Sequence, residues 1–158
     1  MGNFREFYNK HRGRLFGYLM RSTGDYHLSS DILQESFTRY LEKYGEEDLS
    51  PTLLFTIARN AIIDGYRKKV YDAPPFDEPR LPQPNPETRL LVREDYRRVL
   101  NAMLKLAPEE RDALSLAVSS ELSYREIARI TGTSEGNVKL RVHRARMKLR
   151  TMINKGQQ

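Results

Sequence analysis

The sequence predicts an all-α protein made of two small helical domains that are joined by a Pro-rich linker. Apolar residues recur at helical spacing in both halves of the 158-residue chain, and no run shows the alternation typical of a strand. The stretch "YDAPPFDEPRLPQPNPE", which begins at Tyr71, is instead rich in proline. We therefore expect an N-terminal domain at 1–70, a linker at 71–86 and a C-terminal domain at 87–158.

Three helices are expected in the N-terminal domain. The first runs from Phe4 to about Thr23, and the second runs from His27 to Tyr44. Ser50-Pro51 opens the third, because Ser caps helices and Pro suits the first helical position. This third helix is apolar almost all round, so we expect it to be the central, most buried element.

The third helix also carries two groups of polar residues, one among its apolar positions and one at its C-terminal end. Asn60 and Asp64 lie four residues apart among apolar neighbours, and we expect them to hydrogen-bond inside the protein. The end of the helix is basic and carries Arg59, Tyr66 and the run Arg67 to Lys69. Its cations suit the helix dipole. They also suit phosphates, with the aromatic ring stacking on single-stranded bases.

The C-terminal domain contains the pattern of a helix-turn-helix. Helices are expected from about Pro86 to Leu106 and from Pro108 to about Ser119. A capping box, Ser123 with Glu126, then opens a short helix that ends at Gly132. Ser134 caps the basic segment "EGNVKLRVHRARMKLR", which in such motifs enters the DNA major groove.

The basic segment predicts a helix with two different faces. At 100° per residue, Val138, Val142 and Ala145 share an apolar face, and Leu140, His143 and Arg144 lie opposite. Arg or Lys recognises guanine and Leu contacts a thymine methyl, whereas cations at the flanks suit phosphates. The predicted DNA-binding residues are Asn137, Lys139, Leu140, Arg141, His143, Arg144 and Arg146.

Composition limits the classes of function. The 15 basic and 9 acidic residues of 87–158 give this segment a net charge of +6, whereas 1–70 is nearly balanced, so DNA attraction resides in the C-terminal half. Cysteine is absent, and no run is apolar enough to enter a membrane. A nuclease would have to use the carboxylates of Asp25, Asp31 and Glu35. These are interleaved on an exposed helix, and no His or Gly-rich loop is arranged around them. We therefore expect no enzymatic activity, no metal and no cofactor.

Three motifs in order resemble the extracytoplasmic-function (ECF, group IV) sigma factors of the sigma-70 family. "DILQESFTRYL" resembles their polymerase-docking segment, and "LFTIARNAIIDGYRKK" resembles their promoter −10 segment. "LSYREIARITGTSEGNVKLRVHRARMKLR" resembles their −35 domain. The resemblance extends from about Phe4 to Arg150 and implies a region 2-like bundle followed by a region 4-like helix-turn-helix domain.

The resemblance also implies partners and roles. Asp31, Gln34 and Glu35 would dock on core RNA polymerase, and the loop from Gly45 to Pro51 would hold a flipped base. The residues near −10 promoter DNA would be Asn60, Arg67 and Lys68. The protein would act in the cytoplasm as an alternative sigma factor that directs promoter-specific initiation, and an anti-sigma factor would regulate it.

One alternative retains the DNA-binding domain without polymerase. A stand-alone helix-turn-helix regulator would use the same recognition helix, usually as a dimer on paired half-sites. The polymerase-docking and −10-like segments of the N-terminal half argue against this alternative.

Overall fold

The computed structural model describes residues 2–47, 49–72, 93–119 and 121–156, which form seven α-helices and no strand. The predicted all-α class is confirmed. Three helices make up the N-terminal half: α1 (Gly2–Thr23), α2 (Tyr26–Tyr44) and α3 (Pro51–Asp72). Within these described ranges, no helix combines the length and apolar character that crossing a membrane demands.

Four helices make up the C-terminal half: α5 (Glu94–Leu104), α6 (Pro108–Ser119), α7 (Tyr124–Thr131) and α8 (Glu135–Gly156). The helix expected to end at Leu106 ends two residues earlier, where the Leu106 N–H turns back to the Met103 carbonyl at 3.1 Å. Residues 73–92, which include most of the expected linker, lie outside the described residues.

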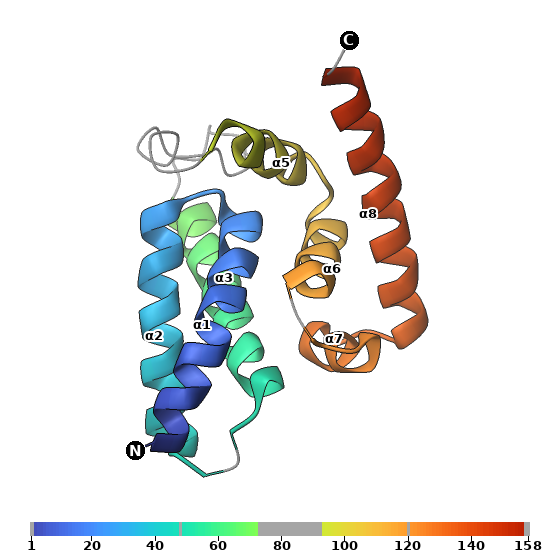
Figure 1. Cartoon of the computed structure of the whole chain (residues 1–158). Helices are drawn as coiled ribbons and strands as arrows, with labels where there is room; N and C mark the ends of the chain where they lie inside the picture. The colour runs from blue at the N-terminus through green and yellow to red at the C-terminus, as the bar shows by residue number, and fades with distance from the viewer. Residues whose placement is uncertain (1, 48, 73–92, 120, 157–158) are drawn as a thin grey trace.

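The helix at the centre of the molecule is α1, so the expectation that α3 would be central is wrong. α1 packs against α2, α3, α5 and α6 (Figure 1), and its Leu15, Tyr18 and Leu19 are fully buried. On α3, Leu54, Phe55 and Ala58 are buried, but Leu53 and Ile57 are only half-buried. The apolar sequence of α3 therefore did not predict correctly which helix is surrounded by the others.

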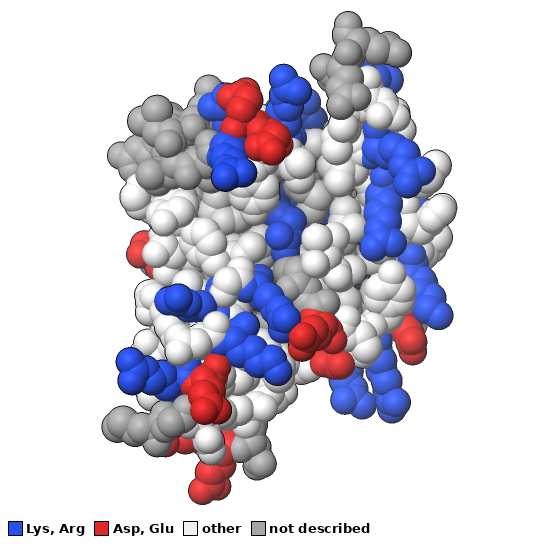
Figure 2. Space-filling model, viewed as in Figure 1, with Lys and Arg blue, Asp and Glu red and all other residues white. Residues whose placement is uncertain are grey.

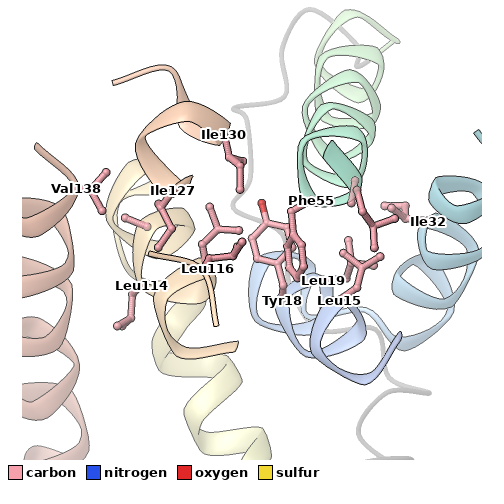
Figure 3. Packing of buried hydrophobic residues seen from close by; sticks show 14 of the residues in the cluster. Leu15, Tyr18, Leu19, Ile32, Phe55, Leu114, Leu116, Ile127, Ile130 and Val138 are labelled. Atoms are coloured by element: carbon pink, nitrogen blue, oxygen red, sulfur yellow. The ribbon is translucent and has the colours of Figure 1, made fainter. Parts of the chain in front are cut away.

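The two halves share one apolar core. Tyr18 and Phe55 contact each other with ring centroids 5.7 Å apart, and in Figure 3 they lie beside Leu116 of α6 and Ile130 of α7. Burial of such side chains is favourable by about 1.5–3 kcal/mol each. This contact therefore holds the two halves together. The packing of the halves on each other through these side chains is the closed arrangement of the chain.

A close approach at Gly24 lets α5 pack on the end of α1. Gly24 follows α1 with φ 65°, in the left-handed region, and its N–H bonds to the Met20 carbonyl at 2.8 Å. A Cβ atom at Gly24 would lie 2.8 Å from Cδ1 of Leu104, which is closer than real contacts. Only glycine fits both the dihedral angle and the neighbour.

The substitution Gly24→Ala is expected to lower the free energy of unfolding by at least ~1 kcal/mol, because it adds left-handed strain and a clash with Leu104. Gly13→Ala is the matched control, since Gly13 lies inside α1 and has nothing within 4 Å of its Cβ direction. It is expected to leave stability unchanged or to raise it by up to ~1 kcal/mol. Urea unfolding measures the free energy of unfolding of both variants. An equal loss of stability in the two would contradict the conclusion that the backbone and the neighbour at position 24 require glycine.

Candidate nucleic-acid and polymerase interfaces

The helix-turn-helix begins with the capping box that the sequence predicts. The Ser123 hydroxyl accepts the Glu126 N–H at 3.1 Å, and a Glu126 carboxylate oxygen accepts the Ser123 N–H at 3.4 Å. These reciprocal bonds satisfy N–H groups that a helix start otherwise leaves without partners. They fix where α7 begins.

The turn between α7 and α8 also follows the prediction. Gly132 has φ 69°, and both its N–H and that of Thr133 bond to the Ala128 carbonyl, the latter at 3.0 Å. The bond from Thr133 is the 6→1 bond of the Schellman motif, and the bond from Gly132 is the 5→1 bond of the αL motif, both of which end helices. Ser134 then accepts the Asn137 N–H at 3.1 Å, so α8 starts at once and at a fixed angle.

The two predicted faces of α8 are confirmed. Val138, Val142 and Ala145 are fully buried, whereas Leu140 is 43% exposed and Met147 is 50% exposed. Leu140 and Met147 thus lie on the side of α8 that faces away from the C-terminal core. Figure 2 shows Lys and Arg side chains gathered along the edge of the molecule that α8 forms.

The seven predicted −35 residues lie on the exposed side of α8 or at its margin. Lys139, Leu140, His143, Arg144 and Arg146 are exposed, as is Asn137, whose amide donates to the Thr133 hydroxyl at 3.0 Å. Arg141 is half-buried, which suits a flanking role. Lys148, by contrast, donates to Glu110 of α6 at 2.8 Å and so anchors α8.

The predicted polymerase-docking residues lie on the outer face of α2. Asp31, Gln34 and Glu35 are all exposed. The Gln34 amide donates to the Tyr8 hydroxyl at 3.3 Å, and Arg39 pairs with Glu35 at 2.5 Å. In Figure 1, α2 and α8 lie at opposite edges of the molecule, so the two candidate surfaces face different directions.

Three apolar residues of α2 are also exposed to solvent. Leu28 is 36% exposed, Leu41 is 39% exposed and Tyr44 is 37% exposed. Apolar character alone does not distinguish these positions from core positions, because buried Phe37 and Tyr40 on the same helix are also apolar.

On α3, the expectation of an internal hydrogen-bond network is wrong. Asn60 and Asp64 are both exposed. Both lie away from the face that carries buried Leu54 and Ala58, so they are open to solvent. Arg67 and Lys68 belong to the last part of α3, but their side chains lie outside the described part of the chain.

A polar contact between the halves was not foreseen from the sequence. Asp112 of α6 accepts one hydrogen bond from the Tyr18 hydroxyl at 2.6 Å and a second from Nε of Arg59 at 2.7 Å. The two donors stand 94 and 53 residues away from Asp112, so no local pattern connects them. Burial, and then the Asp112 carboxylate, hold the pKa of the Tyr18 phenol well above its ordinary value. Tyr18 is therefore a neutral donor at pH 7.

Three further polar contacts cross between the halves. Arg21 of α1 donates to the Ser115 carbonyl of α6 at 3.1 Å. Arg14 of α1 donates to Glu121 at 2.9 Å, just before α7. Thr52, in the first turn of α3, donates to Glu126 at 3.0 Å, so this carboxylate serves the capping box and the contact between halves together.

Comparison with known proteins identifies both halves. The sigma-70 region 2 family matches residues 7–70, and the sigma-70 region 4 family matches residues 96–149. The fold and the exposed recognition helix thus belong to sigma-70-type initiation factors.

Relatives of similar length narrow this class. The chain is 31% identical to the ECF RNA polymerase sigma factor SigM of Bacillus subtilis (strain 168), over 96% of this chain and 95% of SigM. It is 32% identical to EcfG of Rhodopseudomonas palustris (strain TIE-1), over 88% of this chain and 78% of EcfG. The chain belongs to the ECF RNA polymerase sigma factors. It is an alternative sigma factor that directs transcription initiation.

Solved structures agree on the fold. The sigma factor RpoE of Bartonella quintana, in complex with the anti-sigma factor NepR, matches with a TM-score of 0.79 over 98% of both chains at 22% identity. CnrH, in complex with the cytosolic domain of CnrY, matches with a TM-score of 0.70 over 96% of this chain and 88% of CnrH at 23% identity.

The two faces of α8 predict opposite effects of truncation. Val138→Ala is expected to lower the free energy of unfolding by ~1–3 kcal/mol, because it leaves a cavity beneath the recognition helix. Leu140→Ala, two residues away and 43% exposed, is expected to change stability by less than ~0.5 kcal/mol. Thermal unfolding followed by circular dichroism tests the pair, and a larger loss for Leu140→Ala would contradict the orientation of α8.

Proposed function

We propose that α8 recognises the −35 promoter element through its exposed side. The supporting observation is the separation of faces on this helix: Val138, Val142 and Ala145 are buried while base-reading side chains remain exposed. Lys139, Leu140, His143 and Arg144 face the groove and contact base edges. Asn137, Arg141 and Arg146 contact the phosphates that set the position of the helix.

The N-terminal domain has two roles in this proposal. Asp31, Gln34 and Glu35 dock on core RNA polymerase through the exposed face of α2. Asn60, Arg67 and Lys68 of α3 contact melted −10 DNA, and the loop from Gly45 to Pro51 holds a flipped base. The functional units are 1–70 and 87–158, and residues 71–86 act as the tether. Linking two modest contacts through polymerase raises the effective affinity of each.

Regulation and setting complete the proposal. The protein is a group IV factor that works in the cytoplasm, and an anti-sigma factor binds it. The supporting observation is that RpoE of Bartonella quintana, which shares this fold, was solved as a complex of a sigma factor with the anti-sigma factor NepR. The protein carries out no reaction of its own and requires no cofactor, because RNA polymerase makes the transcript.

The direct test is transcription in vitro with core RNA polymerase and a genomic promoter pool, followed by sequencing of RNA starts. Wild-type protein is expected to give new starts that share paired upstream motifs. Arg144→Ala is expected to reduce initiation at these promoters by ~5–150-fold, since a good base contact contributes ~1–3 kcal/mol. Arg150→Ala, exposed on the same helix, serves as the control and should have little effect.

The same experiment separates the alternatives. No new starts and no co-elution with core polymerase would reject a sigma factor function, and a stable dimer on duplex DNA would then favour the stand-alone regulator. Tight duplex binding by the free protein in a gel-shift assay would also contradict the proposal, which expects weak binding without polymerase.

The docking role of α2 has its own test. Asp31→Lys reverses a charge on the exposed face of α2 and is expected to weaken binding to core polymerase at least ~10-fold without loss of stability. Glu6→Lys makes the same change at an exposed position of α1 and should leave binding nearly unchanged. Fluorescence titration of labelled protein with core polymerase measures both. Equal weakening would assign the effect to overall charge.

A further inference from the structure

Two donors of the N-terminal domain converge on a single anionic group. Nε of Arg59 on α3 and the Tyr18 hydroxyl on α1 donate to the two different oxygens of the Asp112 carboxylate, at 2.7 and 2.6 Å. Both donors belong to the N-terminal domain, whereas the acceptor belongs to α6. The N-terminal domain therefore carries an anion site that the other domain fills.

The chemistry of this site suits a phosphate. A guanidinium and a neutral hydroxyl are among the donors that proteins use for phosphate oxygens, and charge-assisted bonds of this kind are strong. The Arg59 side chain is 25% exposed and the Asp112 side chain 19% exposed, so the pair lies at the margin of the core. An anion that approaches α3 after the halves separate would meet the same donors.

The position of the site on α3 indicates which molecule would supply the phosphate. Arg59 immediately precedes Asn60, on the helix to which the proposed function assigns the −10 strand. The C-terminal domain covers this helix at a second point, where Glu126 accepts the Thr52 hydroxyl at 3.0 Å. The outer faces of α2 and α8 remain uncovered in the same arrangement (Figure 1). The closed arrangement thus covers α3 at Arg59 and Thr52, leaves Asn60 exposed, and leaves the outer faces of α2 and α8 accessible.

We propose that Arg59 and Tyr18 form a binding site for a backbone phosphate of single-stranded −10 DNA, and that Asp112 occupies this site in the closed arrangement. DNA strand and Asp112 then compete, so entry of the strand requires separation of the halves. This inference rests on the proposed function of α3. Phosphate oxygens can take the place of the carboxylate oxygens as acceptors, so both donors would keep a partner when the halves separate.

The main test measures binding of a fluorescein-labelled, mixed-sequence single-stranded 20-mer by anisotropy, since a phosphate contact needs no particular sequence. Asp112→Asn is expected to tighten binding ~10-fold and to steepen the slope of log K against log salt by ~0.7, the value for one added phosphate on single strands. Glu109→Gln makes the same charge change at an exposed position of α6 and should leave binding unchanged.

Arg59→Gln tests whether DNA binds at Arg59 itself or at other parts of α3 that become exposed when the halves separate. It removes the ion pair with Asp112 and is expected to open the halves, but it should not tighten binding or steepen the salt slope. An affinity gain equal to that of Asp112→Asn would overturn the proposal, because other parts of α3 would then bind the DNA.

Opening is measured independently of DNA chemistry. The chain contains no cysteine, so Asn9→Cys on α1 and Asn154→Cys on α8, both exposed, accept a fluorophore pair for energy transfer in the full-length protein. Asp112→Asn should enlarge the low-transfer population several-fold. In the otherwise unaltered pair, added 20-mer should do the same, because a ligand that binds only the open form shifts the population.

The results distinguish two failures. Unchanged energy transfer in both Asp112→Asn and the DNA titration would overturn this inference, even if the transcription experiment establishes the proposed function. Opening and tighter DNA binding together with failed transcription would uphold the phosphate site and reject its place in initiation. The DNA titration of the unaltered pair applies even if Asp112→Asn does not fold.

Discussion

The contact of α1 and α3 with α6 and α7 is the constraint on which the remaining structure depends. Tyr18 and Phe55 extend the N-terminal core to Leu116 and Ile130, so one apolar cluster spans both halves. Packing at this contact brings the Asp112 carboxylate to the edge of that cluster. A carboxylate that has lost most of its water needs donors, and the N-terminal half supplies them from two helices. The polar contact is therefore a consequence of apolar packing.

The same packing determines which surfaces remain available. α8 buries its valines against the C-terminal core and is fixed to α6 by the bond between Lys148 and Glu110. Its basic side consequently faces outward. α2 packs on α1 and α3 with its other side, so its acidic face also remains exposed, at the opposite edge of the molecule. In the proposed function, polymerase and duplex DNA thus bind to separate surfaces of the chain.

Unlike the outer faces of α2 and α8, α3 contacts the other half of the chain, so its neighbours change if the halves separate. Arg59 and Thr52 hold side chains of the C-terminal half in the closed arrangement. A ligand of α3 and the closed arrangement then oppose each other, and thermodynamic linkage makes the effect reciprocal. Strand binding would favour separation, and separation would favour strand binding. Such coupling would restrict access to the proposed phosphate site at Arg59 without blocking either outer surface.

The sequence by itself determined the all-α class, the capping box at Ser123, the turn at Gly132 and the two faces of α8, because each depends on neighbours within a few residues or on helical periodicity. The family resemblance also came from ordered local motifs. Only the tertiary structure decided that α1 is central, that Asn60 is exposed, and that Asp112 meets Tyr18 and Arg59. Those features depend on how separate helices pack, and residues 53 and 94 positions apart leave no periodic signal in the chain.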